Sequence, residues 1–128
     1  MCRILIVEDE PNIRRLISVN LTARGFATQE ARNAAQGLEM IRDSVPDAII
    51  LDVKLPGMSG WELLDMIVGD EVLPIIPVIV LTAQVLESDS NPMRYPNVCD
   101  VIFKPISGID RLMQAVHHAV ESQQDANA

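Results

Sequence analysis

Five short strand-like runs, separated by helical patterns, constrain the fold of this chain more than any other feature. They lie at residues 4–7, 27–30, 48–51, 78–81 and 101–103. Apart from the second, the runs are continuously apolar and lack the alternation of apolar and polar residues that a half-exposed strand shows. Continuous apolar strands are typical of a parallel sheet that is buried on both faces. We therefore expect a parallel sheet with helices on both sides.

Helix signals fill the stretches between these runs. Pro11 suits the first turn of a helix and Gly25 suits its end. Asn33 is a favourable N-cap for a second helix, which is expected to end before Pro46. Strands that alternate with helices in this way are joined by right-handed crossovers. The predicted fold class is therefore α/β, as an open three-layer sandwich.

The connection between residues 82 and 100 departs from this regular pattern. A fourth helix is expected there, but Pro92 and Pro96 interrupt it. Because a proline inside a helix costs roughly 3 kcal/mol, this fourth helix is predicted to be short, kinked or partly loop.

Length and charge limit the range of functions. A chain of 128 residues supports one domain, which we expect at residues 1–122, followed by a polar C-terminal tail at residues 123–128. The formal net charge of −8 argues against direct binding to nucleic acid, which normally requires a basic face. No apolar run approaches the about 18 residues of a membrane helix, and the first residues show no signal-peptide pattern. We therefore expect no contact with a membrane. Because Cys2 and Cys99 have no metal or redox spacing, we also expect a cytoplasmic protein.

Polar side chains follow four of the five predicted strands. Glu8 and Asp9 follow the first, Asp52 the third, Thr82 the fourth and Lys104 the fifth. In a parallel sheet all the carboxyl ends lie on one edge, where ligands bind. The sequence therefore predicts that these side chains surround one crevice.

The chemistry of such a crevice is restricted. Neighbouring carboxylates repel one another unless one is protonated or a hard cation binds. Oxygen ligands with few protein donors suit Mg²⁺, and a carboxylate can act as a nucleophile and form an aspartyl phosphate. That chemistry also needs a fixed cation and a hydrogen-bond donor for the phosphoryl oxygens, roles that Lys104 and Thr82 fit.

Four motifs together make the sequence similar to a known family. They are Ile-Val-Glu-Asp at residues 6–9, Leu-Asp-Val-Lys-Leu-Pro-Gly-Met-Ser-Gly at 51–60, Leu-Thr-Ala at 81–83 and Lys-Pro at 104–105. Each motif alone is weak, but their order and their positions at strand ends are specific. The chain resembles the receiver domain of bacterial two-component response regulators, over about residues 3–122.

The resemblance implies a sheet order of 2-1-3-4-5 and a set of site roles. Asp52 would accept a phosphoryl group in a Mg²⁺-dependent reaction from a histidine kinase, a histidine phosphotransfer protein or a small acyl phosphate. Lys104 would pair with the phosphoryl oxygens, and Thr82 would move to bind the phosphoryl group. The implied magnesium ligands are Glu8, Asp9, Asp52 and the backbone carbonyl of Lys54.

The resemblance also implies how the signal leaves the domain. The chain would be a signalling switch that catalyses only its own phosphorylation and dephosphorylation. A downstream protein would bind the face formed by the fourth helix, the fifth strand and the fifth helix. On that face the family usually has Tyr or Phe three residues before the lysine, whereas this chain has Val101. Trp61, close to the loop after Asp52, is a possible reporter of metal binding.

Three other functions stay open. The departures at Val101 and around Pro92 would suit a docking module that works regardless of phosphorylation. The chain could equally be the regulatory domain of a larger, often DNA-binding, regulator. A phosphatase with an aspartate nucleophile is the most distant alternative, because Lys54 occupies the position where such enzymes place their second acid.

Overall fold

A five-stranded parallel sheet forms the centre of the protein. The computed structural model describes residues 2–82, 95–104 and 108–127, with side chains as far as residue 121. The strands are β1 (Arg3–Val7), β2 (Ala27–Ala31), β3 (Ala48–Asp52), β4 (Val78–Thr82) and β5 (Val98–Phe103). They are all parallel, in the order β2-β1-β3-β4-β5. The predicted parallel sheet and its strand order are both confirmed.

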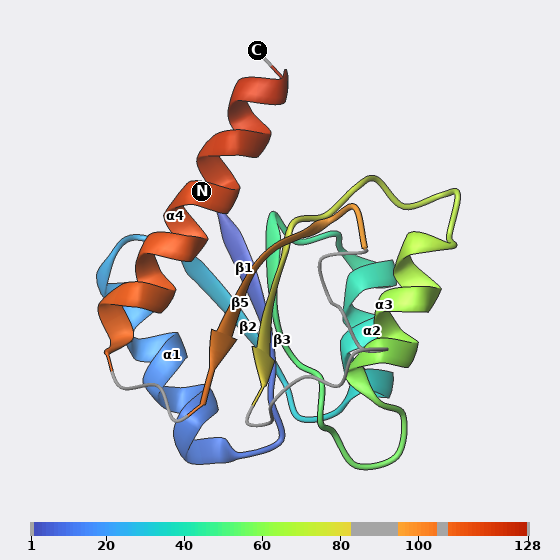
Figure 1. Cartoon of the computed structure of the whole chain (residues 1–128), viewed down its shortest axis with the longest axis horizontal. Coiled ribbons are helices and arrows are strands. Elements are labelled where there is room, and N and C mark those ends of the chain that lie inside the picture. The colour runs from blue at the N-terminus through green and yellow to red at the C-terminus, as the bar shows by residue number, and fades with distance from the viewer. Residues whose placement is uncertain (1, 83–94, 105–107, 128) are drawn as a thin grey trace.

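Helices cover both faces of this sheet. They are α1 (Pro11–Ala23), α2 (Ala34–Asp43), α3 (Gly60–Val68) and α4 (Ile109–Asn127), the last being the predicted fifth helix. Figure 1 shows α1 and α4 on one side of the sheet and α2 and α3 on the other. The predicted three-layer sandwich is confirmed, whereas residues 83–94, where the irregular fourth helix was expected, lie outside the described residues.

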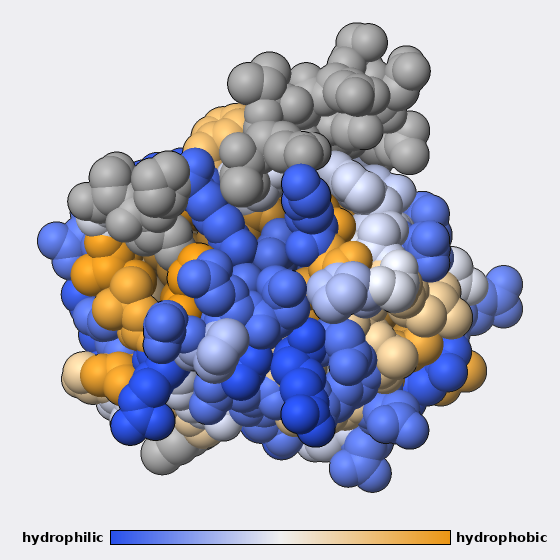
Figure 2. All heavy atoms as spheres, turned by 90° about the horizontal axis from the view of Figure 1, so that it is seen from below, coloured by the Kyte–Doolittle hydropathy of each residue, from blue (hydrophilic) through white to orange (hydrophobic). Residues whose placement is uncertain are grey.

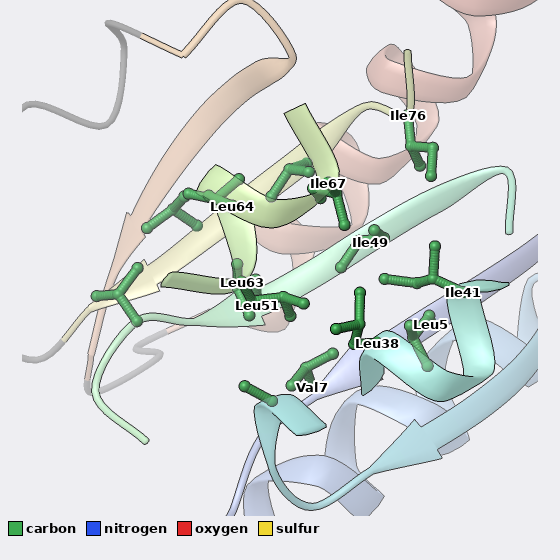
Figure 3. Close-up of a cluster of buried hydrophobic side chains, with 14 of the residues drawn as sticks. Leu5, Val7, Leu38, Ile41, Ile49, Leu51, Leu63, Leu64, Ile67 and Ile76 are labelled. Carbon is green, nitrogen blue, oxygen red and sulfur yellow. The ribbon is translucent and has the colours of Figure 1, made fainter. Parts of the chain in front are cut away.

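Two clusters of buried hydrophobic side chains lie on the two faces of the sheet, and β1 contributes to both. Successive side chains of a strand point to opposite faces. Leu5 and Val7 of β1 belong to the cluster under α2 and α3, while Ile4 and Ile6 belong to the cluster under α1 and α4. Figure 3 shows the first cluster, in which side chains from β1 and β3 meet those of α2 and α3. The continuous apolar runs of the sequence are thus buried on both faces.

The helix boundaries follow the predicted local signals. Asn33 Oδ1 accepts a hydrogen bond of 2.8 Å from the backbone N–H of Gln36 and caps α2. Pro11 lies in the first turn of α1, and Gly25 follows that helix with a φ of +91°, a conformation that suits glycine. The helix α2 ends at Asp43, ahead of Pro46, as predicted.

Two boundaries differ from the sequence prediction. The strand β5 starts at Val98, three residues earlier than predicted, because the exposed Cys99 and the half-buried Asp100 interrupt its apolar run at the edge of the sheet. The helix α4 continues to Asn127, through most of the stretch expected to be a tail. Within the described part of the chain, no helix is long and apolar enough to span a membrane.

Candidate functional site

The carboxyl ends of the strands bring the predicted polar residues to one edge of the sheet. Glu8 follows β1, Asp52 ends β3, Thr82 ends β4 and Lys104 follows β5. Figure 2 looks at this edge and shows a mostly hydrophilic surface across its middle, with apolar patches on its flanks. The parallel topology is therefore the reason why residues far apart in the sequence form one site.

Lys104 joins two of the acidic side chains. Its Nζ lies 2.7 Å from Glu8 Oε2 and donates a hydrogen bond of 3.0 Å to Asp52 Oδ2. Its backbone N–H donates to the carbonyl of Thr82 at 2.8 Å, which ties the end of β5 to β4. Glu8 and Asp52 are both buried, so the ammonium balances carboxylate charge that water reaches poorly.

Three carboxylates converge at this edge. An oxygen from each of Glu8, Asp9 and Asp52 lies within 4.8 Å of the others. Glu8 and Asp52 are buried but Asp9 is exposed, so the cluster is open to solvent on one side. Mg²⁺ binds oxygen ligands and keeps several of its waters, so these residues fit that ion.

A raised pKa at Glu8 is the main electrostatic feature of this cluster. Burial raises the pKa of its carboxyl to about 7, the charge of Asp52 acts in the same direction, and Lys104 opposes both. Burial alone would lower the pKa of Lys104, but its hydrogen bonds to Glu8 and Asp52 outweigh this and raise that pKa above its ordinary value. With a pKa of about 7, the Glu8 carboxyl is partly protonated near neutral pH and becomes mostly ionised as the pH rises above that value.

The loop after β3 holds Asp52 from the other side. The backbone N–H of Lys54 donates a hydrogen bond of 3.0 Å to Asp52 Oδ1, while the side chain of Lys54 is exposed. At Gly60 a Cβ atom would lie 2.5 Å from Val53 Cα and 2.6 Å from the carbonyl oxygen of Asp52. A glycine is needed there because α3 begins directly against the backbone of the site.

Thr82 completes the group of predicted site residues. It is 2% exposed and pairs in register with Phe103, the residue before Lys104. All the residues predicted for the site thus lie on this edge of the sheet. Ala83 and Pro105, the last residues of two of the motifs, lie outside the described residues.

Arg14 was not predicted as part of this site, but the structure places it beside the acidic residues. Arg14 Nη1 donates a hydrogen bond of 2.9 Å to the carbonyl oxygen of Glu8, and Arg14 Nε lies 3.2 Å from Glu30 Oε1. The arginine lies on α1, where a charged side chain is usually solvated. The negative charge of Glu30, near the end of β2, was the one signal in the sequence that could have indicated that the Arg14 side chain turns toward the site.

Comparison with known proteins decides the family. A family model described as the response regulator receiver domain matches residues 4–117 of this chain. The chain is a member of the response regulator receiver domain family. The resemblance seen in the sequence is confirmed.

Relatives of this receiver domain include both longer proteins and proteins of similar length. It is 42% identical over 104 residues to the phosphate regulon transcriptional regulatory protein PhoB of Pseudomonas aeruginosa, a match that covers 81% of this chain and 45% of PhoB. It is 33% identical over 113 residues to the polar-differentiation response regulator DivK of Brucella anthropi, covering 88% of this chain and 91% of DivK. The receiver domain therefore spans less than half of PhoB but most of DivK.

A solved structure shares the fold as well. The response regulator TrrA of Thermotoga maritima, in complex with Mg²⁺ and BeF, superposes with a TM-score of 0.77 at 30% identity. The match covers 93% of this chain and 99% of that one. This likeness agrees with the observed order of the strands and with helices on both faces of the sheet.

Position 101, where the resemblance predicts Tyr or Phe, is occupied by an aliphatic side chain. Val101 is half-buried against the cluster under α2 and α3, and Phe103 is 56% exposed. The rings of Trp61 and Tyr95 instead stack with centroids 6.1 Å apart, and Tyr95 Oη donates a hydrogen bond of 2.7 Å to Asp65 Oδ1. This pair connects the start of α3, next to Asp52, to the chain that enters β5.

Proposed function

We propose that this receiver domain accepts a phosphoryl group on Asp52. The supporting observation is how the Asp52 carboxylate is held: Lys54 donates to Oδ1 and Lys104 to Oδ2, with two further acids alongside. The donor is the phosphohistidine of a histidine kinase or of a histidine phosphotransfer protein, or a small acyl phosphate. The product is the phosphorylated, switched signalling state of the domain.

The side chains divide the work of the transfer. A carboxylate oxygen of Asp52 attacks phosphorus and forms the new O–P bond. The P–N bond of the donor breaks, and its electron pair stays on the imidazole, which leaves neutral because its other ring nitrogen carries the proton. Lys104 turns from Asp52 to the phosphoryl oxygens and balances their charge, and the hydroxyl of Thr82 donates a hydrogen bond to the same group.

A divalent cation completes this site. Its ligands are Glu8, Asp9, Asp52 and the backbone carbonyl of Lys54. When bound, Mg²⁺ supplies positive charge that stabilises the oxygens of the transferring group. The Mg²⁺ and BeF complex of the related TrrA supports this assignment by similarity.

Treatment with acetyl phosphate tests the proposal. Mg²⁺ and acetyl phosphate should add one phosphoryl group to the protein, measured by intact mass spectrometry, and a chelator should prevent the addition. Asp52→Asn should abolish the adduct. Asp43→Asn removes an exposed carboxylate from the end of α2 and should leave the adduct unchanged. An adduct that survives in Asp52→Asn would refute the assignment.

The output of the switch is carried by β5 and α4, while the predicted fourth helix of the output face lies outside the described residues. A downstream protein binds this face in its phosphorylated form. The second candidate function is docking that does not depend on phosphorylation, and the observation that favours it is the aliphatic, half-buried Val101. Equal partner affinity of the wild-type protein with and without the phosphoryl group would establish docking, and a large difference would establish the switch.

A further inference from the structure

Arg14 connects three elements next to the acidic cluster. Its Nη1 donates to the carbonyl oxygen of Glu8 at 2.9 Å, and its Nε lies 3.2 Å from Glu30 Oε1. The arginine itself lies on α1, the carbonyl belongs to the loop after β1, and Glu30 lies near the end of β2. The Arg14 side chain is only 19% exposed, so its planar guanidinium is held in place by both contacts.

The carbonyl held by Arg14 belongs to the peptide group between Glu8 and Asp9. The rest of Glu8 is fixed by other contacts, because its N–H donates to the carbonyl of Ala31 at 3.0 Å and its Oε1 accepts from the N–H of Glu10 at 3.2 Å. Asp9 is exposed, so the direction of its carboxylate depends on its backbone. Rotation about the Cα–C bond of Glu8 moves this carbonyl and Asp9 together, so a change at that bond would break the contact with Arg14 and turn Asp9 away from Glu8 and Asp52.

We propose that Arg14 is a positioning residue for the magnesium site. By fixing the Glu8–Asp9 peptide group, Arg14 keeps the Asp9 carboxylate directed at the point where Glu8 and Asp52 also converge. This inference rests on the proposed function, since it requires the acidic cluster to bind Mg²⁺.

The charge of Arg14 and its positioning contact have opposite effects on metal affinity. A positive side chain near a cation site repels the cation, so removal of that charge alone would strengthen Mg²⁺ binding. Loss of a group that orients a ligand typically weakens metal binding by roughly 10- to 100-fold. The sign of the change in affinity therefore separates the two effects.

Arg15 provides the matched control. It carries the same charge one residue further along α1, and it is exposed. Arg15→Gln thus removes one positive charge from the same helix without removing the contact to the Glu8 carbonyl.

Calorimetric titration with Mg²⁺ alone, at fixed pH and ionic strength, tests the inference on the full chain. Arg14→Gln is expected to weaken Mg²⁺ binding by roughly tenfold. Arg15→Gln should bind Mg²⁺ as tightly as the wild type, or slightly more tightly. Arg14→Lys should bind Mg²⁺ with an affinity between those of the wild type and Arg14→Gln. A lysine ammonium can reach the Glu8 carbonyl but cannot contact that carbonyl and Glu30 together, as the two nitrogens of the guanidinium do.

Circular dichroism confirms that each variant is folded before titration, and Arg14→Lys decides the question if Arg14→Gln does not fold. If both Arg14 variants bind Mg²⁺ as tightly as Arg15→Gln, the positioning role is wrong while the proposed function stands. If the wild-type protein itself takes up no Mg²⁺, the proposed function fails and this inference fails with it.

Discussion

Protons and Mg²⁺ should compete for Glu8. The carboxyl is buried, and its pKa is raised to about 7, mainly by burial. A protonated carboxyl is a poor metal ligand, so binding of Mg²⁺ must release the proton that the metal-free site holds. We therefore predict that the apparent affinity for Mg²⁺ rises with pH through neutrality.

The size of the effect follows from that pKa. Protonation multiplies the apparent dissociation constant by a factor of one plus the ratio of protonated to ionised Glu8. For a pKa of about 7 this factor is about 11 at pH 6 and about 1.1 at pH 8. The affinity should therefore increase about tenfold between these two pH values. For an unburied glutamate, with a pKa of about 4.3, the same interval would change the affinity by only a few per cent.

Titration with Mg²⁺ at several pH values, followed by calorimetry or by Trp61 fluorescence, measures this dependence. Calorimetry in buffers of different ionisation enthalpy also measures the proton that is released. Glu8→Gln should bind Mg²⁺ more weakly but almost independently of pH. Glu39→Gln, which removes an exposed carboxylate of α2, should keep the wild-type dependence. A wild-type affinity that is constant over this interval, or a Glu8→Gln variant that keeps the full dependence, would refute the reasoning.

Two further substitutions test the structure around Asp52. Gly60→Ala places a Cβ atom 2.5 Å from Val53 Cα and should lower the free energy of unfolding, measured by urea titration, by roughly 1–3 kcal/mol. Gly108→Ala is the control, because a Cβ atom at Gly108 would lie in open space and should not lower that free energy. Equal stability of the two variants would show that α3 does not begin against the site backbone. Lys104→Met leaves Glu8 and Asp52 without their shared cation and should cost the metal-free protein roughly 3 kcal/mol, part of which added Mg²⁺ restores. Lys54→Met, at an exposed side chain, is the control, and equal urea midpoints for the two lysine variants would contradict the bridging role.

The fold was predictable wherever burial dictates the residue type. The strands β1, β3 and β4 are buried along nearly their whole length, so their sequences are uninterrupted apolar runs that cannot be mistaken for half-exposed strands. The start of β5 was not predictable in the same way, because this strand is at the edge of the sheet and contains the exposed Cys99. The end of α4 was missed because small polar residues at a terminus are compatible with either helix or tail.

The site was predictable as a location but not as a set of contacts. Parallel strands bring Glu8, Asp52 and Lys104 to one edge, and that conclusion needs only the order of strands and polar residues. The sequence does not reveal that a single ammonium bridges both acids. It also does not reveal which way Arg14 turns, because a long flexible side chain on a helix can reach either solvent or the neighbouring loop.

The stacked pair of Trp61 and Tyr95 was missed for a third reason. The two rings come from α3 and from the segment before β5, and their contact depends on how those elements pack. No local pattern encodes such a contact. Trp61 stays a predicted reporter of metal binding, since its ring lies at the beginning of the helix that follows the site loop.

Chemical trapping of the phosphorylated residue tests the central claim most directly. The protein is treated with acetyl phosphate and Mg²⁺, reduced with borohydride, digested and analysed by mass spectrometry, because borohydride converts an aspartyl phosphate to homoserine. Phosphorylation of Asp52 predicts homoserine at position 52 in the Mg²⁺-treated sample and none in the sample with chelator. Homoserine at another position, or none at position 52 when the intact mass shows a phosphoryl group, would contradict it.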